Sequence, residues 1–333
     1  MDLVLLLVCG LTVLLTYHSI NWLIFFLTKV GLVVKDQNKK DRPLIPISGG
    51  LAVLVGFLFG VLLYVCVNIF YTGILPWNID GSNLTLIFAS LIAIIWVTLV
   101  GFFDDAFIHG SNEKSLGLGQ LQKPLLTLLG AIPLMIVLSE RTSVFIPYFG
   151  DISVGWIYPL ILIPIGFVGA ANMVNMLAGF NGLEAGMGAI YLFSLGMYAY
   201  VHQSFVASLI AFIALSTVLT FWYFNKIPAK IFPGDSLTYF LGGALATVAI
   251  VGGLEFPALI ISIPFLVEFL LKWRSNFSAD TFGIWINGKI LSKYEKVYSI
   301  MHLFTRTGNF TEKQITNYVV AIQIFFSVLI WLI

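Results

Sequence analysis

The chain has 333 residues, of which 59% are hydrophobic and only 10% are charged, and its mean hydropathy is +0.99. Water-soluble globular proteins contain about 25% charged residues, so this composition excludes a soluble fold. The formal net charge of +1 comes without a basic stripe, which argues against a nucleic-acid partner. We predict instead an all-α, polytopic membrane protein, because a bilayer can cover this much apolar surface.

Apolar stretches that are long enough for membrane helices follow one another along the chain. We predict about ten helices, near residues 3–27, 49–70, 84–103, 124–139, 154–171, 186–201, 205–223, 236–252, 257–272 and 316–333. Together they form one domain over residues 1–333, with a polar excursion at about 273–315. Cys9 and Cys66 lie in apolar stretches and lack the spacing of a zinc site or a disulfide framework, so we expect both to be packing residues.

The basic residues are distributed unevenly between the loops that connect these helices. Of the 17 Lys and Arg residues, only Arg141 falls in an even-numbered loop when the loops are numbered along the chain. The positive-inside rule places the basic, odd-numbered loops in the cytoplasm. We therefore expect a cytoplasmic excursion at 273–315 and both termini on the non-cytoplasmic side. Such a protein would lie in the cell membrane of a prokaryote or the ER membrane of a eukaryote.

Acidic and amide side chains gather at helix ends on the predicted cytoplasmic face. Asp104 and Asp105 end the third predicted helix, and Asp235 follows the seventh. Two further groups lie after the fifth predicted helix and before the last one. They comprise Asn172, Asn175, Asn181 and Glu184, and then His302 and Arg306. Carboxylates are costly in a membrane protein, so their positions are informative.

Each cluster taken alone has a purely structural explanation. Adjacent acids at a helix end are usually solvated, although the helix macrodipole disfavours anions there and favours a neighbouring cation. Asn172 and Asn175 share a helix face, where amides also join helices by hydrogen bonds. The segment around Asp235 is compatible with a tight turn that caps the next helix. The clusters nevertheless lie on one face in separate loops, whereas the other face has only scattered acids, which favours a shared site.

The chemistry of these side chains indicates a magnesium site. Asp and Asn oxygens suit Mg²⁺, a hard cation whose coordination is usually completed by water and substrate phosphates; Mn²⁺ is the alternative ion. Basic residues on the same face are available to bind a polyphosphate. These are Lys114, Lys123, Lys226, Lys230 and Arg306. From the residues alone we expect magnesium-dependent phosphoryl chemistry on a lipid at the cytoplasmic interface.

At these residues the sequence resembles the polyprenyl-phosphate N-acetylhexosamine-1-phosphate transferase family. These membrane enzymes join a sugar 1-phosphate to a lipid phosphate carrier, and the resemblance covers nearly the whole chain. It is carried by Asp41-Arg-Pro-Leu-Ile-Pro-Ile-Ser-Gly-Gly50, the Asp104-Asp105 pair, Asn172-x-x-Asn175, Ile231-Phe-Pro-Gly-Asp235-Ser and the segment from His302 to Glu312. These motifs all fall on the predicted cytoplasmic face.

The resemblance implies roles for the acids and for two of the amides. Asp235 would ligate Mg²⁺ with help from Asn175, and Asn172 would support this polar surface. Asp104 and Asp105 would form the family's acid pair. One of the two would act on the lipid phosphate or orient the metal shell, and the sequence leaves open which one does so.

The resemblance also implies how the substrates are bound. Lys123 would contact the pyrophosphate, with Lys114 as the alternative. Asn181 would read uracil through its amide, and Phe232 would stack on the base. The remaining substrate-binding candidates are Glu184, His302 and Arg306, of which the last two would contact the sugar.

The motif that begins at Asn175 is similar to the version in eukaryotic and archaeal UDP-GlcNAc:dolichyl-phosphate GlcNAc-1-phosphate transferases. The bacterial cell-wall branch usually has Asp-Gly where this chain has Ala178-Gly179. This similarity implies UDP-GlcNAc as donor, a polyprenyl (dolichyl-type) phosphate as acceptor, and a first step of N-glycan assembly. The segment from His302 to Gly308 is instead similar to the bacterial style, with one histidine where several are expected. An undecaprenyl-phosphate transferase for envelope polysaccharide or peptidoglycan precursors is therefore the alternative.

A multispan transporter is the competing functional class, because about ten spans with intramembrane Gly and Pro also suit alternating access. That class predicts charged residues at mid-bilayer and an inverted repeat, and the sequence shows neither. The expected partners are thus UDP-GlcNAc, a polyprenyl phosphate and the lipid bilayer, and a homodimer is left open.

Overall fold

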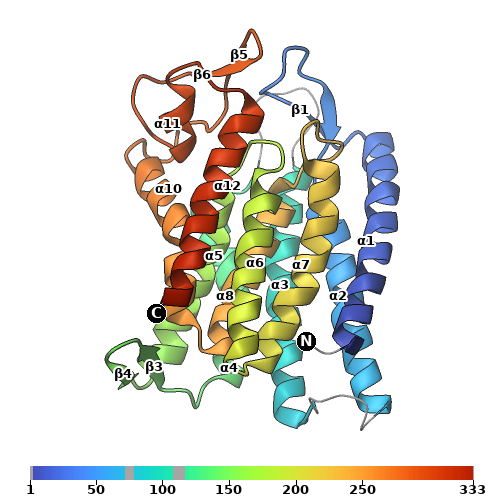
Figure 1. Ribbon diagram of the computed structural model, residues 1–333, viewed down its shortest axis with the longest axis vertical. Coiled ribbons are helices and arrows are strands. Elements are labelled where there is room, and N and C mark those ends of the chain that lie inside the picture. Colours follow the sequence, from blue (N-terminus) through green and yellow to red (C-terminus); the bar gives the residue numbers. More distant parts are fainter. Residues whose placement is uncertain (1–2, 72–78, 108–116, 333) are drawn as a thin grey trace.

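The computed structural model describes residues 3–71, 79–107 and 117–332. They form a bundle of long helices that run roughly side by side (Figure 1). The helices are α1 (Leu3–Val30), α2 (Gly50–Phe70), α3 (Gly81–Ala106), α4 (Gln122–Val137), α5 (Ile163–Met176), α6 (Leu183–Val201), α7 (Phe205–Asn225), α8 (Gly234–Gly252), α9 (Glu255–Ile261), α10 (Ile263–Trp273), α11 (Ile300–Thr305) and α12 (Glu312–Leu329). A π-helical turn, η1 (Tyr158–Leu162), precedes α5, and a 3-10 turn, η2 (Ile330–Leu332), follows α12.

Three antiparallel hairpins lie at the two ends of the bundle. The strand pairs are β1 (Val33–Lys35) with β2 (Leu44–Pro46), β3 (Ser143–Ile146) with β4 (Gly150–Ser153), and β5 (Gly283–Ile286) with β6 (Lys289–Ser292). In Figure 1, β1, β5 and β6 lie at the upper end and the β3–β4 hairpin lies at the lower end, toward which α12 descends. The sequence predicted no strands. All three hairpins lie in segments that were predicted as loops, so they do not change the predicted helical fold class.

Seven described helices are long and apolar enough to cross a bilayer, namely α1, α2, α3, α5 with η1, α7, α8 and α12 with η2. The bent pair α9–α10 makes eight if it counts as one span. Helix α4 is apolar but has only 16 residues. The chain is therefore an all-α polytopic membrane protein with seven or eight candidate spans among the described residues. A helix or helix pair occupies each of the ten predicted stretches, but the count of ten spans stays a prediction.

Helix α8 lies at the centre of the bundle, and 83% of its most apolar stretch is buried. Small side chains allow close packing, because membrane helices associate largely through van der Waals contact. A Cβ atom at Gly242 would lie 2.5 Å from the carbonyl oxygen of Ala170 in α5. At Gly243 it would lie 2.6 Å from the Val97 side chain in α3. Helix α8 is thus held tightly against α3 and α5.

Two predicted helices differ from the structure. Helix α5 continues to Met176, beyond the predicted end at 171, so Asn172 and Asn175 belong to the helix and not to the loop after it. The stretch predicted as one helix near 257–272 is two helices bent by 57°. The single-helix prediction was wrong because Pro264, in the first turn of α10, cannot donate a backbone hydrogen bond and breaks the helix.

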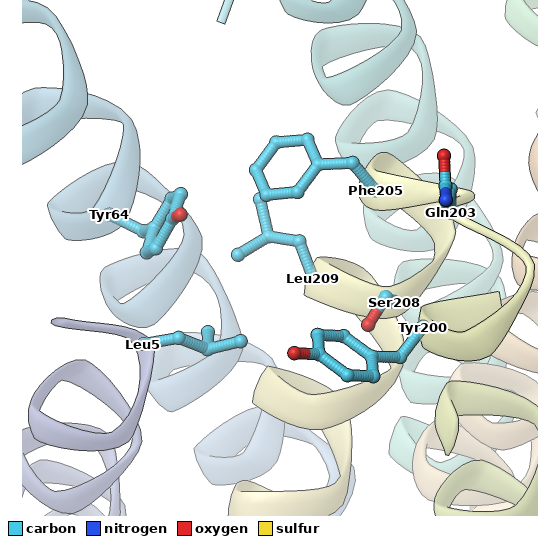
Figure 2. A pocket seen from close by; sticks show the side chains of 7 residues that line it. All are labelled: Leu5, Tyr64, Tyr200, Gln203, Phe205, Ser208 and Leu209. Carbon is cyan, nitrogen blue, oxygen red and sulfur yellow. The ribbon is translucent and has the colours of Figure 1, made fainter. Parts of the chain in front are cut away.

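A pocket lies between α1, α2, the end of α6 and the start of α7, at the end of the bundle where α1 begins. Figure 2 shows the side chains that line it. They are Leu5, Tyr64, Tyr200, Gln203, Phe205, Ser208 and Leu209. None of these residues is charged, so this pocket does not suit the polyphosphate chemistry predicted from the sequence.

Candidate active site

Charged side chains from three helices meet at the end of the bundle opposite the neutral pocket. Lys123 Nζ, in the first turn of α4, lies 2.7 Å from Asp104 Oδ2 at the end of α3 and 2.7 Å from Asp235 Oδ2 at the start of α8. The three side chains keep only 23%, 9% and 24% of their surface exposed. We call Asp104, Lys123 and Asp235 the acid–lysine centre. Its ammonium group is the cation that the acids at the end of α3 were expected to need.

The carboxylate of Asp235 is oriented by Asn175 from α5. The amide nitrogen of Asn175 donates to Asp235 Oδ2 over 2.9 Å. The amide oxygen of Asn175 accepts from the hydroxyl of Thr238 over 2.9 Å. A carbonyl oxygen has a second lone pair, so Asn175 keeps one acceptor position for a further ligand.

Asp105 lies next to Asp104 in the sequence but has a different environment. It is fully buried, and its carboxylate accepts from Ser48 Oγ at 2.6 Å and from the backbone N–H groups of Asp235 and Ser236 at 2.8 and 3.1 Å. These N–H groups belong to the first turn of α8, where an anion is favoured by the helix macrodipole. Asp105 therefore fixes the end of α8 that carries Asp235.

Gly234 makes this approach between α3 and α8 possible. Its backbone has a φ of +66°, which L side chains adopt only with strain. A Cβ atom there would lie 2.2 Å from Asp105 Oδ2. The Pro-Gly-Asp segment thus requires glycine directly before Asp235.

Asn172 joins the helices around the acid–lysine centre. Its amide nitrogen donates to Thr127 Oγ1 in α4 at 3.1 Å and to the Val168 carbonyl at 2.8 Å. Its amide oxygen accepts from the hydroxyl of Tyr239 in α8 at 3.2 Å. Asn172 therefore connects α5 to the helices that carry Lys123 and Asp235.

Asn225, at the end of α7, connects two loops near the site. Its side chain is fully buried; it accepts from the Gly182 N–H at 3.0 Å and donates to the Ile231 carbonyl at 2.9 Å. The first contact holds the loop with Asn181, and the second holds the segment that leads to Phe232. Asn225 thereby ties the predicted base-binding segments together.

The tail of the first loop pairs with the segment before Asp235. The Phe232 N–H donates to the Pro46 carbonyl at 2.8 Å, and the Gly49 N–H donates to the Phe232 carbonyl at 3.0 Å. The Phe232 side chain is half-buried. Two motifs that carried the family resemblance are therefore adjacent in space.

Asn181 and Glu184 are both buried at the start of α6. Glu184 Oε1 accepts from the Gly179 N–H at 2.6 Å, and the Asn181 amide donates to Asp36 in the first loop at 2.8 Å. Asp36 was not among the predicted site residues. These contacts join the first loop to the loop between α5 and α6.

His302 and Arg306 lie apart from these contacts, in and after α11. His302 is fully buried. Its Nδ1 atom accepts from the Tyr298 N–H at 3.1 Å, and Nε2 donates to the Asp280 carbonyl at 3.0 Å. Burial lowers the pKa of His302 below its ordinary value. Both ring nitrogens are occupied by the backbone, while Arg306 is exposed and pairs with no described acid. Sugar binding by these two residues stays a prediction.

The other candidate lysines are not part of the acid–lysine centre. Lys226 Nζ lies 4.8 Å from the ring centroid of Tyr223, and Lys230 Nζ lies 6.0 Å from that of Phe224. Both lysines therefore lie against aromatic rings at the end of α7. Lys114 lies outside the described residues.

The acid–lysine centre fits a divalent cation that binds few protein ligands. Two carboxylates from different helices already share one cation, the Lys123 ammonium. Over residues 3–71, 79–107 and 117–332, no group of three or more His, Cys, Asp or Glu side chains is arranged to hold a metal. Mg²⁺ commonly binds one or two carboxylates and completes its shell with water and phosphate, so this donor set suits it.

Several residues that position the site were not predicted from the sequence. Ser48, Asn225 and Asp36 all make the buried contacts described above. Ser48 lies within a motif that carried the family resemblance, and Asn225 ends an apolar helix. A polar residue at the edge of an apolar stretch was therefore a usable signal for both, because buried polar groups need hydrogen-bond partners. No signal in the sequence indicated Asp36, because its partner Asn181 is distant along the chain.

Comparison with known proteins agrees with this arrangement. The model of "Glycosyl transferase family 4" matches residues 87–253. A Saccharolobus solfataricus protein named "Putative UDP-N-acetylglucosamine--dolichyl-phosphate N-acetylglucosaminephosphotransferase" is 31% identical over 95% of this chain and 92% of its own. A phospho-N-acetylmuramoyl-pentapeptide-transferase of Halalkalibacterium halodurans is 32% identical over 73% of this chain and 72% of its own.

These relatives confirm the family resemblance seen in the sequence. The family model covers both the acid pair at the end of α3 and the start of α8, so it includes all three residues of the acid–lysine centre. A Methanocaldococcus jannaschii protein named "Putative glycosyltransferase MJ1113" is also 31% identical over 72% of this chain and 66% of its own. The chain, a membrane transferase, belongs to glycosyl transferase family 4.

Proposed function

We propose that this protein transfers GlcNAc 1-phosphate from UDP-GlcNAc to a polyprenyl, dolichyl-type phosphate. An oxygen of the lipid phosphate attacks the donor phosphorus next to the sugar. The bond between this phosphorus and the oxygen that joins the two phosphates of the donor breaks. UMP leaves with that oxygen, and lipid-diphosphate-GlcNAc forms. This reaction is the first step of lipid-linked oligosaccharide assembly for N-glycans.

One observation carries the proposal, namely the convergence of Asp104, Lys123 and Asp235 from three helices on one point. Phosphoryl transfer requires groups that position the reactants and neutralise charge on the phosphoryl oxygens. A lysine held by two carboxylates at a helix end supplies both cationic and metal-binding groups. The neutral pocket at the other end of the bundle offers neither.

The residues of the site have distinct tasks in this reaction. The Lys123 ammonium, at the start of α4, binds the diphosphate, and the N-terminus of that helix adds a positive field. A lipid monophosphate is mostly ionised near neutral pH, because its second pKa is about 6, so no strong general base is required. Asp105 positions α8 through its buried hydrogen bonds, which leaves Asp104 as the acid beside the lipid phosphate.

Asp104 and Asp235 would hold Mg²⁺, with Asn175 assisting, and the bound ion supplies charge neutralisation at the phosphates. Asn181 and Phe232 would bind the uracil, with Glu184 beside them, and His302 and Arg306 would contact the sugar. The name of the Saccharolobus relative supports UDP-GlcNAc and dolichyl phosphate as the substrates.

Activity of the purified protein is the direct test. With Mg²⁺ and UDP-GlcNAc, UMP release is expected only when a polyprenyl phosphate is added, and it should stop when EDTA removes the metal. The donor panel includes UDP-N-acetylmuramoyl-pentapeptide, because the Halalkalibacterium relative is named for that reaction. Faster turnover of this donor, or UMP release without any lipid phosphate, would contradict the proposed function.

The proposal includes ten spans in one domain, with both termini and the β3–β4 hairpin outside and residues 273–315 in the cytoplasm. Cysteine labelling tests this topology in a variant that lacks Cys9 and Cys66. A membrane-impermeant maleimide is expected to label Tyr148→Cys, at a position 91% exposed, in intact cells. Asp41→Cys, in the first loop, should react only after the cells are opened. The reverse pattern would show that the orientation is wrong.

A further inference from the structure

The loop between α5 and α6 is held by a buried polar cluster. Asn181, which is 5% exposed, donates from Nδ2 to Asp36 Oδ2 at 2.8 Å and from its backbone N–H to Glu312 Oε1 at 3.1 Å. The Lys39 ammonium lies 3.5 Å from Asp36 Oδ2 and also contacts Glu312. We call Asp36, Lys39, Asn181 and Glu312 the Asp36 cluster. It joins the first loop, the start of α6 and the start of α12.

The cluster determines which way the Asn181 amide points. An ionised carboxylate only accepts hydrogen bonds, so Asp36 requires the amide nitrogen of Asn181 and excludes its oxygen. The Lys39 ammonium lies beside the same Asp36 oxygen that accepts from Asn181. The side-chain oxygen of Asn181, Oδ1, accepts no hydrogen bond from the described residues and is not sealed from solvent. The polar atom that Asn181 offers to a ligand is therefore an acceptor.

The cluster is placed to act on a nucleotide. Asn225 bonds both Gly182, the neighbour of Asn181, and Ile231, the neighbour of Phe232. The segment that carries Phe232 and the segment that carries Asn181 are thus both held by Asn225. Asp235, three residues after Phe232, belongs to the acid–lysine centre that would bind the diphosphate.

We infer that Asp36 determines base selectivity by fixing the Asn181 amide with its oxygen toward the donor base. Uracil presents a ring N–H to such an acceptor, whereas the corresponding ring nitrogen of cytosine carries a lone pair and is rejected. Asp36 is a positioning residue, since it acts on the base through Asn181. This inference rests on the proposed nucleotide donor.

Substitution of Asp36 by Asn would reverse the orientation of the Asn181 amide, and this variant tests the inference. The new amide can donate from Nδ2 to Asn181 Oδ1 while its oxygen still accepts from the Asn38 N–H, as Asp36 Oδ1 does at 3.2 Å. Asn181 would then turn and offer its nitrogen to the base. We expect the ratio of UDP to CDP affinity to fall roughly tenfold, the effect of one buried hydrogen bond.

Binding of UDP and CDP is measured by calorimetry on the purified protein with Mg²⁺, without any need for turnover. Asp41→Asn removes an exposed acid from the same loop and should keep the wild-type ratio. Asn181→Ala, as a second variant, should abolish the preference without reversing it, and melting curves check that each variant is folded. A folded Asp36→Asn protein with the wild-type ratio of UDP to CDP affinity would overturn this inference but not the proposed function. A wild-type protein that binds neither nucleotide would overturn the proposed function as well.

Discussion

Asp235→Asn is expected to lower the rate of the proposed GlcNAc 1-phosphate transfer by roughly 10²–10³-fold while the protein stays folded. The amide has the shape of the carboxylate, but it cannot neutralise Lys123, which lies 2.7 Å away. It also removes one of the two anionic ligands proposed for Mg²⁺. The Mg²⁺ concentration that gives half-maximal rate should therefore rise. Initial rates of UMP release over a Mg²⁺ titration measure both effects.

Two further variants make this prediction specific. Asp151→Asn removes an exposed acid from β4 at the other end of the bundle and should leave rate and Mg²⁺ dependence unchanged. Lys123→Met should lower the maximal rate without raising the Mg²⁺ concentration that gives half-maximal rate, because it removes the proposed phosphate contact and keeps both carboxylates. Wild-type Mg²⁺ dependence in Asp235→Asn would remove Asp235 from the metal site.

The helices of this fold could be predicted because the bilayer leaves a simple signal in the sequence. Long apolar stretches marked all ten helical regions. The predictions that failed concerned local features of single helices and loops. The bend comes from Pro264, which a reading of hydropathy alone does not register. The extension of α5 to Met176 depends on how neighbouring helices pack, and hydropathy does not report packing. The hairpins were missed because strands of three or four residues are too short to show a period of two.

The site could be predicted in part for a similar reason. Asp104, Lys123 and Asp235 were found because charge at the ends of apolar helices is costly and therefore conspicuous. Their convergence on a single ammonium could not be deduced, since it depends on the packing of α3, α4 and α8. The sequence also left open which of Asp104 and Asp105 acts on the lipid phosphate or orients the metal shell. The structure separates them, because Asp105 accepts from backbone N–H groups at the start of α8, whereas Asp104 pairs with Lys123.

Asp105→Asn is expected to lower the melting temperature as well as the activity, which distinguishes a positioning residue from one in the chemistry. Nδ2 of the amide would replace one carboxylate oxygen and face a backbone N–H of Asp235 or Ser236. A buried N–H without an acceptor costs about 1–3 kcal/mol. Ser48→Ala should have a smaller effect, because both backbone contacts of Asp105 remain. Thermal unfolding in detergent and initial rates measure the two quantities for each variant.

The Mg²⁺ dependence of the residual activity separates the two roles. If Asp105 acts only by holding the start of α8, the fraction of Asp105→Asn protein that is correctly folded keeps the wild-type Mg²⁺ requirement. Asp280→Asn, which removes an acid with 49% side-chain exposure, controls for loss of a negative charge elsewhere in the chain and should keep the wild-type melting temperature. A variant at Asp105 that melts like the wild type yet has lost activity would instead place this carboxylate in direct contact with the substrates. In that case the three hydrogen bonds it accepts would serve to orient a reacting group and not the helix.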